Sequence, residues 1–118
     1  MKISILVGVF VLVFSSQISA QTVRNPTTLT FDSVDFDKVD RAELAITRQS
    51  DQAVVQTLVS PGPWAAMTVV VSINVQPVAF DTYVIRARVC KDALCSDWSE
   101  PSNVWDRVPG KPSKPDAK

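Results

Sequence analysis

Two cysteines have the most constrained chemistry in this sequence. Cys90 and Cys95 enclose four residues, 91–94. This spacing suits the tip of a β-hairpin, where facing residues approach closely enough for a disulfide. A redox pair usually has two residues between its cysteines, and a zinc site needs further ligands, which this chain without histidine lacks. We therefore expect a structural disulfide that stabilises by about 2 kcal/mol, and neither a metal nor a cofactor.

Three acidic residues raise the alternative of a small hydrolase. A retaining glycosidase needs two carboxyl groups about 5 Å apart in a cleft, and Asp92, Asp97 and Glu100 are near neighbours in the sequence. The chain has no histidine, the commonest general base, and a compact domain of this size offers little room for a substrate cleft. We therefore expect no catalytic residue, and a hydrolase is the least favoured function.

A second acidic group precedes the middle of the chain. Its members are Asp32, Asp35, Asp37 and Asp40. Oxygen ligands at this spacing suit Ca²⁺, but the loop lacks the glycine and the terminal glutamate of an EF-hand. A solvated acidic loop is the favoured interpretation.

Two surfaces are candidates for binding. The first is the hairpin tip closed by the disulfide, which consists of Lys91, Asp92, Ala93 and Leu94. A rigid tip loses little entropy on binding, although the favoured alternative is that the bridge only stabilises the hairpin end. The second is Trp64, which follows a Pro-Gly-Pro turn; exposure as a ligand platform and packing are equal alternatives for it.

Trp98 is expected to pack. It lies close enough along the predicted hairpin to stack on Arg86 and Arg88 across the outer sheet face, as a cation–π contact.

The residues that position these side chains alternate between apolar and polar with a period of two. Tyr83, Ile85, Ala87 and Val89 share one face, opposite Arg86 and Arg88. This alternation is typical of half-buried strands. Strands are expected at residues 27–33, 41–47, 53–59, 67–75, 83–89 and 96–105, and helical spacing is an alternative for part of the run 41–47. About seven short strands with frequent turns and no long amphipathic helix predict an antiparallel β-sandwich.

The two ends of the chain differ from this middle part. Lys2, the apolar run 3–14 and a small-residue stretch ending at Ala20 predict a signal peptide over residues 1–20, with an uncleaved anchor as the alternative. Residues 109–118 contain no large apolar side chain and predict a flexible tail. One domain, residues 21–108, lies between them. We expect a secreted location, extracellular or periplasmic, which also favours the disulfide.

The segment from Pro77 to Trp105 resembles the last two strands of a fibronectin type III domain. The matching features are a Pro before the strand, a Tyr that opens it, an Arg-rich outer face and a Trp/Ser/Pro return strand. Pro77, Tyr83, Ile85, Ala87, Val89, Arg86, Arg88, Trp98, Ser99 and Pro101 fill these places. The resemblance implies a tyrosine corner, in which the Tyr83 hydroxyl bonds to the backbone of the preceding loop.

The same resemblance implies a binding or adhesion module, with an immunoglobulin-like fold, that is not an enzyme. The tip lacks Arg-Gly-Asp, and residues 95–99 match only half of the WSxWS signature of cytokine receptors, so neither use carries over. The formal net charge of zero gives no basic face for nucleic acid. We expect the partner to be a protein or a surface glycan, recognised through loops or a sheet face, and no membrane contact after signal cleavage. The alternative is a structural subunit of an extracellular or particle assembly, so the protein is either a monomer or an assembly subunit.

Overall fold

The computed structural model describes residues 22–118, and the predicted signal segment lies outside them. Within this part of the chain the regular secondary structure is entirely β, without a helix, which confirms the predicted all-β class. Accordingly, the described residues include no helix long and apolar enough to cross a membrane.

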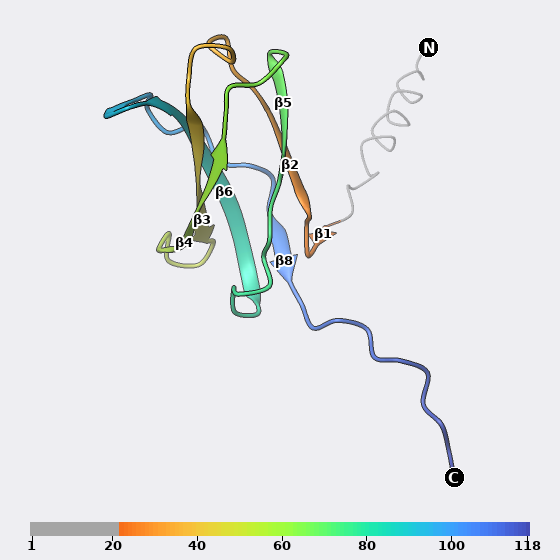
Figure 1. Cartoon of the computed structure of the whole chain (residues 1–118). Helices are drawn as coiled ribbons and strands as arrows, with labels where there is room; N and C mark the ends of the chain where they lie inside the picture. Colours follow the sequence, from red (N-terminus) through yellow and green to blue (C-terminus); the bar gives the residue numbers. More distant parts are fainter. Residues whose placement is uncertain (1–21) are drawn as a thin grey trace, which may run out of the picture.

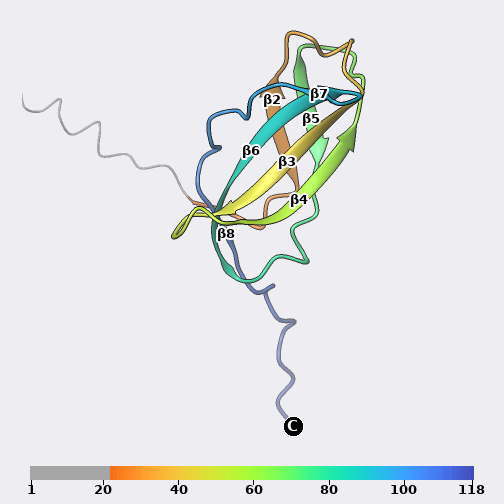
Figure 2. The same cartoon turned by 90° about the vertical axis from the view of Figure 1, so that its left-hand side faces the viewer.

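Eight strands form two sheets. They are β1 (Val23–Arg24), β2 (Thr28–Asp32), β3 (Arg41–Arg48), β4 (Val54–Pro61), β5 (Thr68–Ser72), β6 (Asp81–Lys91), β7 (Leu94–Cys95) and β8 (Trp105–Arg107). The larger sheet has the order β1-β8-β6-β3-β4, with β7 also paired to β6, and the smaller sheet consists of β2 and β5. Figures 1 and 2 show the β2–β5 pair facing β3, β4 and β6.

The core lies between the two sheets. On β3 the side chains of Ala42, Leu44 and Ile46 are at most 1 % exposed, whereas Arg41 and Glu43 lie on the opposite face. Successive side chains of a strand point to opposite faces, so this alternation places one row of β3 in the core. Buried side chains from β5, β6 and β8 complete the core, and they include Val69, Val71, Tyr83, Ile85 and Trp105.

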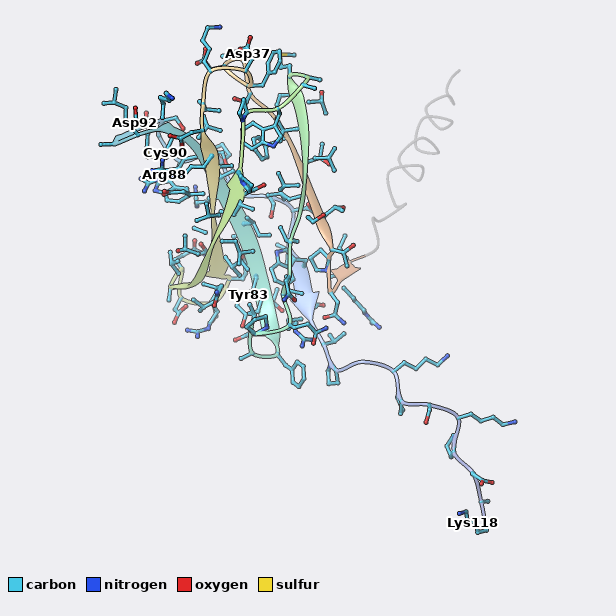
Figure 3. The ribbon with its side chains drawn as sticks, in the orientation of Figure 1. Asp37, Tyr83, Arg88, Cys90, Asp92 and Lys118 are labelled. Carbon is cyan, nitrogen blue, oxygen red and sulfur yellow. A yellow bond between two sulfur atoms is a disulfide. The ribbon has the colours of Figure 1, made fainter. Side chains whose placement is uncertain are left out.

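The tyrosine expected to anchor the loop before β6 does so. The Tyr83 hydroxyl donates a hydrogen bond to the Ala79 carbonyl oxygen at 2.7 Å. The Tyr83 ring packs against Trp105, with ring centroids 5.1 Å apart. In Figure 3 Tyr83 lies near one end of the large sheet, and Cys90 and Asp92 lie toward the other.

The predicted strand over residues 67–75 is too long. Only Thr68–Ser72 forms β5, because its partner β2 begins at Thr28, which pairs with Ser72. Beyond this point Ile73 donates one backbone hydrogen bond to the Thr27 carbonyl oxygen. Every second residue from Val69 to Val75 is buried, as the alternation predicts, but Met67 is 47 % exposed.

The predicted antiparallel pairing fails at the start of the described chain. β1 pairs with β8 in parallel, Val23 opposite Trp105. Asn25, with a φ of 44°, turns the chain after β1 toward β2, and its side-chain oxygen accepts a hydrogen bond from the Val108 amide. After β8, residues 109–118 are exposed, form no strand and run away from the sheets (Figure 1).

The predicted return strand over residues 96–105 is also wrong for most of its length. Only its last residue belongs to a strand, β8. Residues 96–104, which we call the serine segment, follow β6 in another conformation.

Candidate functional site

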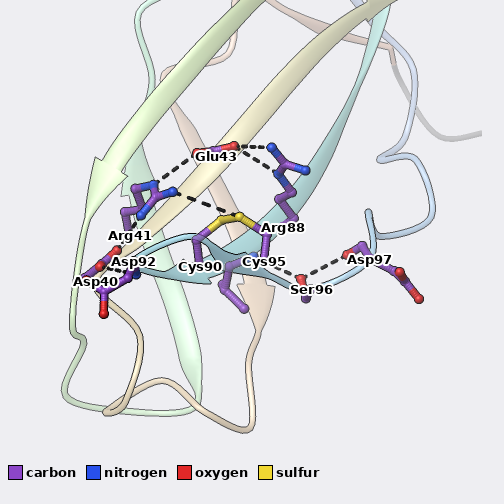
Figure 4. The surroundings of a disulfide bond; sticks show 10 residues. Asp40, Arg41, Glu43, Arg88, Cys90, Asp92, Cys95, Ser96 and Asp97 are labelled. Atoms are coloured by element: carbon purple, nitrogen blue, oxygen red, sulfur yellow. Dashed lines mark hydrogen bonds and ion pairs between the residues drawn. A yellow bond between two sulfur atoms is a disulfide. The ribbon is translucent and has the colours of Figure 1, made fainter.

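The two cysteines form the expected disulfide. Cys90 on β6 pairs with Cys95 on β7, and their Cα atoms are 4.1 Å apart. Cys90 is fully buried and Cys95 is exposed. The bridge therefore fixes the point at which β7 turns back along β6 (Figure 4).

The hairpin tip, residues 91–94, is exposed and held in place. Asp92 adopts a φ of 54°, and its backbone amide donates to the Asp40 carboxylate at 2.8 Å. This hydrogen bond is the largest influence that lowers the pKa of the Asp40 carboxyl group below its usual value. Leu94 is 79 % exposed. The tip is thus a stiff projection with one large apolar side chain, and whether it binds anything stays a prediction.

A charged network joins the tip to the outer face of the large sheet. Arg88 donates from Nε and Nη2 to the Glu43 carboxylate oxygen Oε1 at 2.9 and 2.7 Å. Arg41 donates to Glu43 at 3.0 Å and to Asp40 at 2.9 Å. Hydrogen bonds from Arg88 and then from Arg41 lower the pKa of Glu43 below its usual value. Figure 4 shows Glu43 between the two arginines, beside the disulfide.

Trp98 makes the expected stack with one of the two arginines. The Arg88 guanidinium carbon lies 4.5 Å from the centre of the Trp98 ring. Arg86 instead donates from Nη1 to the Ser99 carbonyl oxygen at 3.2 Å. Because Glu43 and Trp98 both contact Arg88, the indole is fixed against the sheet while 39 % of the residue stays exposed.

Three serines spaced three residues apart attach the serine segment to β6. The backbone amides of Ser96, Ser99 and Ser102 donate to the carbonyl oxygens of Val89, Ala87 and Ile85. Their hydroxyl oxygens accept from the amides of the same β6 residues at 3.1, 2.9 and 2.9 Å. Every third residue of the serine segment is therefore bonded to every second residue of β6. The hydroxyl supplies the acceptor that a carbonyl would supply in a regular ladder.

A groove lies on the outer face of the large sheet, with a volume of about 350 Å³. We call it the sheet-face groove. Its lining residues are Ala45, Thr47, Gln52, Val54, Thr57, Arg86 and Trp98.

The pairing register explains where this groove lies. Thr57 on β4, Ala45 on β3 and Arg86 on β6 form one row across three neighbouring strands. The small Ala45 side chain at the middle of the row leaves a low floor. The serine segment places Trp98 beside it. The groove is thus built on strands on one side and on a serine-anchored segment on the other.

Trp64 lies elsewhere. It is half-buried, packs against the core and makes an edge-to-face contact with Phe31 at 6.2 Å between ring centroids. Of the two alternatives for Trp64, this position supports packing.

The acidic loop does not gather its carboxylates around one point. Asp32 accepts from the Thr68 hydroxyl at 2.9 Å, Asp37 pairs with Lys38, and Asp40 pairs with Arg41. Within residues 22–118 the acidic and cysteine side chains that lie close enough for a shared metal are Glu43, Cys90 and Cys95. Both sulfurs of that group are already joined to each other, so neither is a thiolate ligand.

The carboxylates of the hydrolase alternative also lie apart. Asp97 lines a small hollow with Asp32, Glu100 lines a different hollow, and Asp92 lies at the hairpin tip. These positions give the hydrolase alternative no common cleft.

Sequence reasoning missed the groove floor and the way the serine segment is held. The spacing Ser96, Ser99, Ser102 was a usable signal, because a period of three is unusual beside a strand with a period of two. The row formed by Thr57, Ala45 and Arg86 had no local signal. Comparisons of the chain with protein-family models, with curated proteins and with solved structures found no match.

Proposed function

We propose that this chain is an exported, non-catalytic binding module with a fibronectin type III-like β-sandwich fold. It recognises its partner, a protein or a surface glycan, through the sheet-face groove. The observation that carries this proposal is the groove itself, in which the exposed part of Trp98 stands beside Arg86 over a floor of small side chains. Aromatic walls with a few fixed polar groups are typical of ligand sites.

Three features support the fold. The resemblance of residues 77–105 to the family is one. The second is the Tyr83–Ala79 hydrogen bond at the start of β6, which is the contact of a tyrosine corner. The third is the set of two sheets with a shared core, which is consistent with a β-sandwich.

Two features support export: the N-terminal segment and the disulfide. Lys2, the apolar run 3–14 and Ala20 have the order of a signal peptide. The Cys90–Cys95 disulfide suits an oxidising compartment, extracellular or periplasmic.

The groove is better suited than the hairpin tip to be the primary contact. Its floor lies on β3, which has a strand on each side, so the floor is rigid before any ligand arrives. Trp98 is also held before a ligand arrives, because it stacks on Arg88, whose guanidinium is bound to Glu43. The tip offers one large apolar side chain, Leu94, on an exposed projection, where a ligand would bury little surface.

The test uses the mature protein, residues 21–118, on a glycan array and on a displayed peptide library. Thr57→Arg puts a long side chain on the groove floor, and Ser72→Arg puts the same side chain on the exposed face of β5, away from the groove. We expect the wild-type protein and the Ser72→Arg control to capture the same members, and Thr57→Arg to lose them. Capture that is the same for all three proteins, or absent for the wild type, would contradict the proposal.

A second candidate, a subunit of an extracellular assembly, is favoured by β4. This strand ends the six-stranded sheet, and it carries the exposed side chains of Val54 and Val59. Residues 52–80 contain no charged side chain, so no like charges oppose pairing of two such edges. Light scattering after size exclusion should then give an oligomer that Val59→Lys dissociates. A wild-type monomer at all concentrations rules this candidate out.

A further inference from the structure

The sheet-face groove contains one charged side chain, Arg86. This arginine has no carboxylate partner within the described residues. Arg41, Arg48 and Arg88 each contact a carboxylate oxygen at 2.7 to 2.9 Å. Among residues 22–118, Arg86 has no ion pair, although it lies two positions from Arg88 on the same face of β6. The groove lining also contains no acidic residue. Its electrostatic character is therefore that of a site for one negative charge.

The free edge of the Arg86 guanidinium is the one that binds carboxylates. Its Nη1 atom donates to the Ser99 carbonyl oxygen. Its Nε and Nη2 atoms have no hydrogen-bond partner within the described chain. In Arg88 the same two atoms, Nε and Nη2, hold Glu43. Adjacent rows of the sheet thus each carry an arginine, and Nε and Nη2 bind a carboxylate in the row of Arg88 but not in the row of Arg86.

Trp98 adds an aromatic surface to this cationic group. Arg88 covers part of the ring, and the rest contributes to the groove lining. The C–H face of a pyranose ring packs well against an indole. Gln52 and Thr57, also on the groove lining, carry amide and hydroxyl groups that suit sugar hydroxyls. A volume of about 350 Å³ accommodates one sugar residue.

We propose that the sheet-face groove binds a carboxylate-bearing sugar, such as a uronic acid unit of a glycan. The carboxylate bonds to Nε and Nη2 of Arg86, and the sugar ring lies against Trp98. This inference rests on the proposed function and names the ligand class for the same groove. An acidic peptide would also supply a carboxylate, but it would leave the indole and the hydroxyl-bearing floor without a matching ring.

The experiment is a titration of the mature protein by ¹⁵N heteronuclear NMR, with sodium D-glucuronate as the probe. D-glucose provides the same ring without the carboxylate, and sodium acetate provides the carboxylate without the ring. We expect glucuronate to shift the amide signals of Ala45 and Thr57 and the indole signal of Trp98. Both reference compounds should bind roughly tenfold more weakly or worse.

Three variants identify the contacts. Arg86→Gln should weaken glucuronate binding roughly tenfold or more and leave the response to glucose unchanged. Arg86→Lys keeps the charge but loses the two-pronged edge, so it should give an intermediate loss. Arg24→Gln, which removes an exposed arginine on β1, is the matched control and should bind as the wild type does.

Equal affinity for glucuronate and glucose, or for glucuronate and acetate, would overturn the acidic-sugar assignment. Tighter binding of a glutamate-rich peptide would do the same. If glucuronate fails while Thr57→Arg still abolishes capture on the arrays, only this assignment falls and the proposed function stands. If Thr57→Arg has no effect there either, both fall.

Discussion

Removal of the Tyr83 hydroxyl by Tyr83→Phe isolates one buried contact of the fold. Tyr83 is 1 % exposed, and its hydroxyl donates to the Ala79 carbonyl oxygen at 2.7 Å. Phenylalanine keeps the ring that packs against Trp105. Ala79 is exposed, so water replaces the lost donor at its carbonyl group. The free energy of unfolding should therefore fall by about 1 kcal/mol, which lowers the Tm of a domain of this size by roughly 4–8 °C.

The same substitution has an effect that depends on pH. Burial, followed by the nearby charge of Asp81, raises the pKa of Tyr83 above its usual value. As pH rises past about 10, the unfolded chain loses this proton before the folded protein does. The contribution of Tyr83 to stability is therefore complete below that pH and declines above it. We expect the gap in stability between wild type and Tyr83→Phe to narrow above about pH 10.

Urea denaturation followed by tryptophan fluorescence, at pH 7 and again above pH 10, measures both effects. Tyr83→Ala is the reference for loss of the whole ring and should cost about 3–5 kcal/mol. An unfolding free energy of Tyr83→Phe equal to that of the wild type would refute the role of the hydroxyl. A gap that widens at high pH would refute the effect of burial on its proton.

Three further perturbations test the regions around the groove. The double variant Cys90→Ser/Cys95→Ser should lower the free energy of unfolding by only about 2 kcal/mol in the same urea assay, because the disulfide closes a short loop. An unchanged urea midpoint would argue against this. Ser99→Ala leaves the Ala87 amide without its acceptor and should cost about 1–3 kcal/mol, with faster hydrogen exchange at Ala87; slow exchange there would contradict it. The pKa of Glu43 is lowered in the folded state by its arginine partners, so its contribution is complete above about pH 4.3 and declines as the pH falls. On acidification from pH 5 to pH 3, the Tm of Glu43→Gln should accordingly fall less than the Tm of the wild type, and thermal unfolding at the two pH values measures this difference.

The sequence predicted the strands whose alternation is local. The rows that contain Leu44 and Ile85 repeat every two residues, and burial follows them closely in the structure. The disulfide also followed from local spacing, because Cys90 and Cys95 face each other across the pair β6–β7. Strand conformation and a short cross-strand link need no knowledge of distant residues.

Other features depend on contacts that the sequence pattern does not contain. The groove floor exists because Thr57, Ala45 and Arg86 come into one row, and this register is decided by three strands together. The serine segment was predicted to be the strand that returns from the hairpin tip, because it follows the two cysteines directly. Its hydroxyl contacts become visible only once β6 lies beside it.

Attachment every third residue divides the serine segment into two classes of position. Ser96, Ser99 and Ser102 hold it to β6, while the side chains between them, Trp98 among them, are not needed for that attachment. Substitution at the intervening positions therefore changes what the domain displays without detaching the segment, whereas a one-residue insertion puts the following hydroxyls out of phase. This segment is the natural place to randomise if the domain is engineered toward new ligands.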